Sequence, residues 1–296
     1  MTNIHNSTLS SGNLYIGLPM WQHNHWSQSW FAHSPKSKTQ LSLYAKECNT
    51  VEGNTTFYSL PNEESISRWK EAVDKGFRFA FKFHQNITHV HQLQHCEEEV
   101  AQQLALLSPL RENLGVMMLQ LPAAFGPNKL PVLANFLASL PKWLSVAVEV
   151  RHLEFFAKGD AEVALNQLLM GCGANRVIMD TRALFTGPCD SALLEDVRNK
   201  KPRVPVNVIA TGNTPIVRFV GNDKDEDNIR CLRPWVNKVI QWQKEGKDVY
   251  FFCHRPDNKD APWLAQQFID LYNNAAPQTP FTDLSIKAQP EQNRLF

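Results

Sequence analysis

Five short segments of the chain combine β-strand character with polar residues on alternate positions. In residues 145–151 the odd positions are small or ionisable and the even positions are valine, so the two faces of this strand meet different surroundings. The same alternation occurs in residues 79–84, 116–120, 177–180 and 216–219. In a barrel of parallel strands, one face packs under helices while the other lines a shared cup at the carboxyl ends. We therefore expect these polar strand ends to form one site, although any single charge, taken alone, would also fit an ordinary solvated strand end.

Predicted strands alternate with predicted helices along the chain. The strands are expected at residues 14–18, 49–54, 79–84, 115–120, 145–151, 176–180, 215–219 and 248–254. The helices are expected at residues 63–75, 97–107, 130–140, 160–170, 230–245 and 261–274, with a short one near 191–198 inside a long loop over 181–213. Eight such units are typical of an α/β fold, the TIM-type (β/α)8 barrel, which takes about 250 residues. We predict a single barrel domain over residues 1–276 and an extended polar tail over residues 277–296.

The composition restricts the classes of function. With 30 basic and 29 acidic residues the net charge is +1, so no overall field attracts nucleic acid or anionic lipid. No segment approaches the roughly 20 apolar residues that span a bilayer, and the first residues lack a signal pattern, so a cytoplasmic location is expected. The six cysteines have no C-x-x-C spacing, which argues against a disulfide framework or a metal site built from cysteine.

The strand alternation predicts a set of polar side chains that face the inside of the barrel. This set is Glu52, Lys82, His84, Gln120, Glu149, Arg151, Asp180, Arg218 and His254. Acids and cations crowded into one cup are expected to pair, because an unpaired buried charge costs several kcal/mol. Such a set fits a structural ion-pair network as well as an active site.

As an active site, the set divides into groups that bind an anion and groups that transfer a proton. Arg151 and Arg218 would bind a phosphate or carboxylate with their planar guanidinium groups. Glu149 or Asp180 would act as the general base, and His254 would supply a proton near neutral pH.

Two other hypotheses use the same part of the chain. Glu52 and Lys82 are further catalytic candidates, and Lys82 would form a Schiff base if its amine were desolvated, although a nearby carboxylate would keep that amine charged. A metal ion held by Glu149, Asp180 and His254 is an alternative. No tight spacing such as H-E-x-x-H supports it, so neither a metal nor a cofactor is assigned.

Residues near the predicted strand ends are candidates for substrate contact. They are Trp21, Asn54, Tyr58, His84, His89, Gln120 and His152. Trp21 would stack on a base or sugar, or it would simply cap the barrel. His84 is a second proton donor, whereas the histidine-rich stretch around His89 also fits a solvated loop.

Several of these segments together resemble the YecE-like family, a group of barrel proteins whose domain has no known function. The matching segments are Tyr15-Ile16-Gly17 with Trp21, residues 51–58 (VEGNTTFY), 81–83 (FKF) with Thr88-His89, 119–122 (LQLP), 148–152 (VEVRH), Asp180 and 217–219 (VRF). The resemblance implies a TIM-type barrel with its pocket at the predicted strand ends, and it brings no settled reaction. Many members resemble R-F-H-G where this chain has Arg218-Phe219-Val220-Gly221, so no histidine role is carried over there. Many also have an asparagine pair after the last strand, where this chain has residues 254–258 (HRPDN).

The last residues of the chain suggest a protein partner. Gln292, Leu295 and Phe296 resemble the Q-x-x-L-F peptides that bacterial replication and repair proteins insert into the sliding clamp. Two terminal apolar residues would equally fold back on the barrel.

We expect a barrel enzyme that acts on a small anionic substrate, either phosphorylated or sugar-like. The alternatives are a metal-dependent hydrolase or nuclease recruited to DNA through the tail, and a non-enzymatic adaptor that docks partners through the tail. Barrel folds host many chemistries, so the fold alone does not choose among them.

Overall fold

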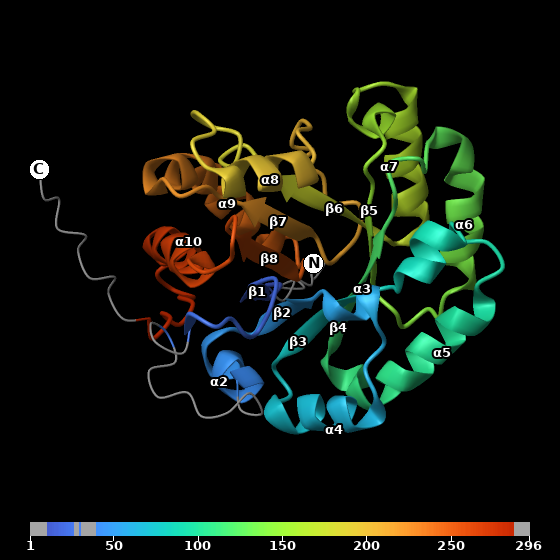
Figure 1. The fold of residues 1–296 in the computed structure, drawn as a ribbon, viewed down its shortest axis with the longest axis horizontal. Coiled ribbons are helices and arrows are strands. Elements are labelled where there is room, and N and C mark those ends of the chain that lie inside the picture. The colour runs from blue at the N-terminus through green and yellow to red at the C-terminus, as the bar shows by residue number, and fades with distance from the viewer. Residues whose placement is uncertain (1–10, 27–29, 31–39, 287–296) are drawn as a thin grey trace, which may run out of the picture.

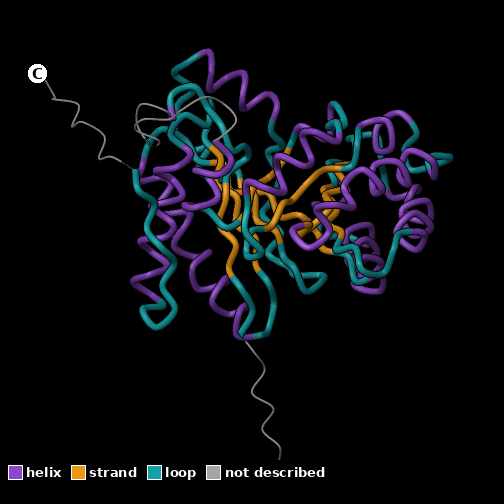
Figure 2. The backbone as a smooth tube through the Cα atoms, turned by 90° about the horizontal axis from the view of Figure 1, so that it is seen from below, coloured by secondary structure: helices purple, strands orange, loops and turns teal. Residues whose placement is uncertain are grey.

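The computed structural model describes residues 11–26, 30 and 40–286, which form a single (β/α)8-like domain. Its eight parallel strands are β1 (Leu14–Gly17), β2 (Thr50–Gly53), β3 (Arg78–Lys82), β4 (Leu114–Gln120), β5 (Val146–Glu149), β6 (Asn175–Asp180), β7 (Ile216–Val220) and β8 (Val249–His254). They are hydrogen-bonded in the order β1-β8-β7-β6-β5-β4-β3-β2, so the sheet curls into a nearly closed barrel. Helices surround the strands, as Figures 1 and 2 show. The predicted (β/α)8 fold is therefore confirmed.

The helices follow the strands around the barrel. The α-helices are α2 (Gln40–Glu47), α3 (Thr55–Tyr58), α4 (Glu63–Ala72), α5 (Glu97–Leu107), α6 (Leu130–Ser139), α7 (Asp160–Cys172), α8 (Ala192–Lys200), α9 (Asp225–Lys244) and α10 (Ala261–Ala275). Shorter turns are the π-helix η2 (Asn86–Val90) and the 3-10 helices η3 (Ser108–Asn113), η4 (Pro127–Lys129) and η5 (Leu153–Phe156). No described helix combines the length and the apolar character needed to cross a lipid bilayer.

Helix ends agree with local sequence signals. Helix α4 starts where the Asn62 side chain accepts a hydrogen bond from the Ser65 backbone N–H, and its first turn carries Glu63 and Glu64. Helix α7 ends at Gly173, whose φ of 68° is left-handed. Helix α9 starts at Asp225, earlier than the predicted residue 230, because three acidic residues open its first turn.

Two apolar layers hold the fold together. The barrel interior is filled by Tyr15, Ala80, Val116, Met118, Ala147, Val177, Ile216, Tyr250 and Phe252. A larger layer between the strands and the helices uses the alternate positions, such as Phe79, Phe81, Val217 and Phe219. Residues that continue the interior series toward the carboxyl ends therefore point into the mouth of the barrel.

Side chains help to join β1 to β2, where the barrel closes. Asn49 accepts a hydrogen bond from the Ile16 N–H and donates one to the Leu14 carbonyl, at 2.9 and 2.8 Å. The Tyr44 hydroxyl accepts from the Leu18 N–H and donates to the Thr50 carbonyl, each at 2.8 Å. The backbone also contributes, because the Glu52 N–H donates to the Leu18 carbonyl at 3.0 Å. These bonds fix Glu52 at the start of the mouth.

The described part of the tail runs without helix or strand along the barrel as far as residue 286. The Asn273 side chain pairs with both backbone groups of Phe281, at 2.8 and 2.9 Å. Gln266 accepts from the Leu284 N–H at 2.7 Å, and Glu47 of α2 accepts from the Ser285 N–H at 2.6 Å. Residues 281–285 are thus fixed to α10 and α2, and we call this segment the strap. The predicted partner-binding residues Gln292, Leu295 and Phe296 lie outside the described residues.

Candidate functional site

An ion-pair network at the mouth of the barrel is centred on Arg218 of β7. Its Nε and Nη2 donate to the two carboxylate oxygens of Glu52 on β2, at 2.8 Å each, and its Nη1 donates to Glu149 of β5 at 2.6 Å. All three residues are almost completely buried. The network therefore brings together three strands that are far apart in the sequence, as the strand alternation predicted.

Further polar residues extend this network along the interior face. The Lys82 Nζ donates to the Gln120 amide oxygen at 2.8 Å and lies 3.8 Å from a Glu52 carboxylate oxygen. His254 Nε2 is 3.2 Å from the other Glu52 oxygen. Arg151 donates from Nε and Nη2 to Glu149, at 3.1 and 3.0 Å, and its side chain is 29% exposed. Arg151 thus forms the solvent-facing edge of the network.

The protonation states follow from burial and from Arg218. Burial is the largest single effect and opposes ionisation of Glu52 and Glu149, but Arg218 and the neighbouring cations together outweigh it and lower the pKa of both carboxyl groups, that of Glu149 to about 2. Burial, together with Arg218, lowers the pKa of Lys82 to about 8. Burial also lowers the pKa of His254 to about 4, although Glu52 opposes this change. At neutral pH both glutamates are ionised and His254 is neutral.

Lys201 is a functional candidate that the sequence analysis missed. It follows helix α8, and the next residue, Pro202, accepts a hydrogen bond from the Thr181 hydroxyl directly after β6, at 3.0 Å. Burial lowers the pKa of Lys201 to about 8, and Arg218 contributes to the same effect across the mouth. The only available signal was the Lys-Lys-Pro-Arg segment in the long loop after the sixth strand, since such loops lie on the carboxyl side of a barrel.

The network has more positive than negative charge. Its cations are Arg218, Arg151, Lys82 and Lys201, while its ionised acids are Glu52 and Glu149. Three of these cations contact a carboxylate, but the Lys201 amine has no hydrogen-bond or ion-pair partner among the described residues. The mouth is therefore electrostatically suited to an anion.

The prediction that Asp180 faces this site is wrong. In the parallel register Met179 lies beside Arg218, while Asp180 lies beside Phe219, which belongs to the layer under the helices. The buried Asp180 carboxylate accepts from Trp235 Nε1 and from Arg182 Nη2, both at 2.7 Å. Residues 177–180 are apolar on both faces except at this last position, so their alternation carried no information about direction.

The direction of Asp180 also bears on the alternative metal site of Glu149, Asp180 and His254. Asp180 is not assembled with Glu149 and His254, so that proposed set is wrong. No group of three or more His, Cys, Asp or Glu side chains suited to a metal ion occurs in residues 11–26, 30 and 40–286.

Two predicted histidines lie at the rim, on the segment that follows β3. His84 lies beyond the end of the strand, where its Nε2 is 3.2 Å from the Tyr58 carbonyl oxygen. His89 is in the π-helix η2, with its ring edge-on to Phe57 at 5.2 Å. Burial lowers the pKa of His89, and Arg151 adds to this effect, which places His89 beside the network. Since π-helical turns often occur at functional sites, His89 remains a substrate-contact candidate.

The backbone directly after η2 has an unusual conformation. Gln92, Leu93 and His95 all have positive φ values of 47–69°, a conformation that costs non-glycine residues energy. The surrounding structure compensates, since the Lys129 amine donates to the Gln92 side chain and the Leu93 N–H donates to the Ile87 carbonyl.

Other predicted contact residues have structural partners. The Asn54 amide donates to the Pro19 carbonyl at 3.0 Å and holds the loop after β1. Trp21 packs edge-on against Trp69 of α4, which supports barrel capping rather than a contact with the network. His152 accepts from the Glu154 N–H at the start of η5. Tyr58 is 68% exposed and sits at the rim beside Phe57.

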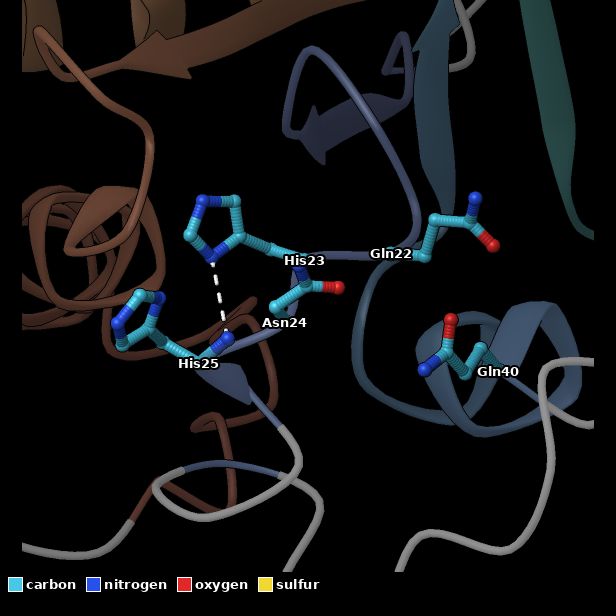
Figure 3. Close-up of a pocket in the computed structure, with 5 residues that line it drawn as sticks. All are labelled: Gln22, His23, Asn24, His25 and Gln40. Carbon is cyan, nitrogen blue, oxygen red and sulfur yellow. Dashed lines mark hydrogen bonds between the residues drawn. The ribbon is translucent and has the colours of Figure 1, made fainter.

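A separate cavity of about 410 Å³ lies in the loop after β1. Figure 3 shows His23 and His25 on one side of it and Gln22 with Gln40 on the other. The His23 Nδ1 accepts from the His25 N–H at 3.4 Å. The cavity shares no lining residue with the ion-pair network, so we do not include it in the candidate site.

Comparison with known proteins identifies the family. The family described as "Protein of unknown function DUF72" matches residues 15–291. The chain belongs to the DUF72 family. Two Escherichia coli members of similar sequence, both called UPF0759 protein YecE, are 40% identical over 283 residues, which is 96% of this chain and 100% of theirs. The resemblance to YecE-like proteins is thereby confirmed.

Solved structures of DUF72 proteins share the fold. One from Enterococcus faecalis has a TM-score of 0.69 at 20% identity and covers 94% of this chain and 99% of its own. One from Thermotoga maritima has a TM-score of 0.66 at 21% identity, covering 88% of this chain and 98% of its own. The shared fold does not by itself define a reaction, because barrel folds host many chemistries.

Proposed function

We propose that this DUF72 protein is an enzyme whose barrel mouth binds a small anionic substrate, such as a phosphate ester or a carboxylate. One observation carries the proposal: four cations share the mouth with only two ionised carboxylates. A bound anion would neutralise the excess positive charge. It would thereby offset part of the free-energy cost of holding these cations close together.

The cations have different positions relative to a ligand. Arg218 is held between Glu52 and Glu149, so it acts mainly as a positioning residue for the two carboxylates. Arg151 and Lys201 are only partly buried, which leaves them the better placed to contact an anion. We therefore expect Lys201 and Arg151 to contact the anion, whereas the sequence analysis expected Arg218 and Arg151 to do so.

The remaining groups would transfer protons. The buried His254 has a pKa lowered to about 4, so it is neutral and a weak base near pH 7, and Glu52, 3.2 Å from its Nε2, would stabilise any proton that it accepts. Glu149 has a strongly lowered pKa, because of Arg218 acting against its burial, and serves better as an electrostatic partner than as a base.

Isothermal titration calorimetry tests the proposal with inorganic phosphate, sulfate, acetate and a panel of phosphorylated sugars. We expect phosphate to bind, and we expect the Arg151→Gln protein to bind it about tenfold more weakly, which corresponds to about 1.4 kcal/mol. The Arg111→Gln protein is the matched control, because Arg111 packs on the exposed Trp143 away from the mouth. Absence of heat with every anion, or equal loss in both variants, would contradict an anion site at the mouth.

The sliding-clamp partner stays a prediction, because its residues lie outside the described part of the chain. Deletion of residues 292–296 tests it independently of the barrel. The truncated protein should lose binding to an isolated clamp while it keeps its affinity for phosphate.

A further inference from the structure

We propose that the amine of Lys201 forms an imine with an aldehyde or ketone group of the anionic substrate. This inference rests on the proposed function and narrows the substrate class to carbonyl compounds that carry a phosphate or carboxylate group. It assigns Lys201, rather than the buried Lys82, as the nucleophile.

Lys201 lies where the end of helix α8 meets the carboxyl end of β6. Helix α8 ends at Lys200, and the backbone N–H of Lys201 still bonds to the Val197 carbonyl at 3.1 Å. The bond from the Thr181 hydroxyl to the Pro202 carbonyl then fixes the chain at the end of β6. Lys201 is half-buried and lies within electrostatic range of Arg218, Glu52, Glu149 and Lys82. A side chain in this position can meet both the network and an entering ligand.

The two lysines of the mouth, Lys82 and Lys201, differ in their bonding partners. The Lys82 amine donates to Gln120 at 2.8 Å, has Glu52 at 3.8 Å and is only 7% exposed, so a ligand would have to displace existing bonds to reach it. The Lys201 amine has no such bond among the described residues. An unpaired amine near another cation is the arrangement that favours a nucleophilic lysine, because neighbouring positive charge disfavours protonation.

The electrostatic effect agrees with this arrangement. Burial and, after it, Arg218 lower the pKa of Lys201 from 10.5 to about 8, against the opposing effects of Glu52 and Glu149. A fraction of Lys201 is therefore unprotonated near neutral pH and available for attack, unlike an ordinary surface lysine.

The proposed step balances without an oxidant or reductant. The Lys201 nitrogen lone pair attacks the carbonyl carbon, a C–N bond forms, and the carbonyl electron pair takes up a proton to give a carbinolamine. The carbinolamine hydroxyl then takes up a second proton, supplied by the solvent, and leaves as water while the nitrogen lone pair forms the C=N bond, which gives a protonated imine. Solvent water carries the proton from the attacking nitrogen to the carbonyl oxygen.

Reductive trapping tests the inference in the full chain. The protein is mixed with a limiting amount of pyridoxal 5′-phosphate, reduced with borohydride and digested, and the adducts are located by mass spectrometry. Lys200 is the internal control, because it is adjacent in the sequence but 70% exposed and paired with Asp196 at 2.7 Å. We expect at least about tenfold more adduct at Lys201 than at Lys200, consistent with a nucleophile activated by a lowered pKa. Excess inorganic phosphate should abolish the difference.

Two further measurements separate this inference from the proposed function. Pyridoxal without its phosphate should still label Lys201 in preference to Lys200, because a lowered pKa favours attack on any carbonyl compound, but less strongly than pyridoxal 5′-phosphate does. The wild-type protein should bind inorganic phosphate in the calorimeter. Equal labelling of Lys200 and Lys201, or preferred labelling of Lys82, would contradict the imine at Lys201. If phosphate still bound in that case, the proposed anion site would stand. If phosphate does not bind to the wild-type protein, the proposed function fails, and the imine fails with it.

Discussion

Arg218 binds both carboxylate oxygens of Glu52 at 2.8 Å, although the two residues are 166 positions apart in the sequence. The same guanidinium group also binds Glu149 at 2.6 Å. A bidentate pair of this kind has a defined geometry, and here it links β7 to β2 across the interior of the barrel. The structural and the ligand-binding roles of this network can therefore be tested separately.

Replacement of Arg218 by Met should destabilise the fold. It leaves Glu52 and Glu149 buried without their main partner, which typically costs 3–5 kcal/mol, or about 4 kcal/mol here. Urea denaturation measures the change in the free energy of unfolding. The Arg68→Met protein is the control, since the Arg68–Glu64 pair is exposed and should contribute less than about 1 kcal/mol. Similar losses in both proteins would mean that the buried network contributes no more than a surface pair.

Replacement of Lys201 by Met should have the opposite effect on stability. It removes a cation without a carboxylate partner from a site that already has excess positive charge, so we expect the free energy of unfolding to increase by about 1 kcal/mol at pH 7. The affinity for phosphate should fall at the same time. Chemical denaturation and calorimetry on the same samples measure both quantities, and Lys200→Met should change neither appreciably. A destabilised Lys201→Met protein would show that Lys201 is a structural residue.

The stability gain from Lys201→Met should fade at high pH. The folded protein releases the Lys201 proton near pH 8, whereas the unfolded chain keeps it up to its ordinary pKa of 10.5. Between these pH values the unfolded chain binds more protons, so the wild-type protein gains stability as the pH rises. Below pH 8 the difference between the two proteins is at its full value, and it should decrease steadily between pH 8 and 10.5. A difference that does not change with pH would contradict the lowered pKa.

Anion binding should weaken as the pH rises through about 8, where Lys82 and Lys201 lose their protons. Sulfate is the suitable probe, because its own charge is constant in this range. Bound sulfate would raise the pKa of both lysines, so binding at pH 8 should take up protons from the buffer. Calorimetry in two buffers of different ionisation enthalpy measures that uptake. Identical heats in both buffers would exclude a protonation change on binding.

Asp180→Asn should reduce stability without affecting anion binding. The Asp180 carboxylate accepts from Trp235 and Arg182 on the outer side of β6, so we expect a loss of about 1–3 kcal/mol for a charged hydrogen-bond partner. Phosphate affinity should equal that of the wild-type protein. A strong loss of phosphate affinity in a folded Asp180→Asn protein would restore Asp180 to the site.

The sequence predicted the barrel and much of its mouth because alternation in several strands was unambiguous. Glu149 and Arg218 stand among apolar residues in clear alternation, and both lie in the network. The prediction for Asp180 failed because its strand is otherwise apolar on both faces. Only the register with β7 reveals the direction in which the Asp180 side chain points. Lys201 was missed because it lies in a loop, where no periodicity relates a residue to the site.

The same limit applies to the histidines and aromatic residues of the rim. Trp21 and Asn54 follow strands, as site residues in barrels do, but their partners are Trp69 and the Pro19 carbonyl. Those contacts depend on how loops pack on neighbouring units, which a single sequence does not encode in any regular pattern. His89 is placed by a π-helical turn, which has no simple sequence signature.

The contacts of the strap can form only after almost the whole described chain has been synthesised. Glu47 accepts its hydrogen bond from Ser285, a residue synthesised 238 positions later, and Leu284 fills a place in the main apolar layer. A nascent chain with all eight strands already outside the ribosome would still lack these contacts between α2 and the end of the chain. The link between α2 and α10 therefore depends on a segment that carries no strand of its own, and chains stopped shortly after α10 should be targets for quality-control proteases.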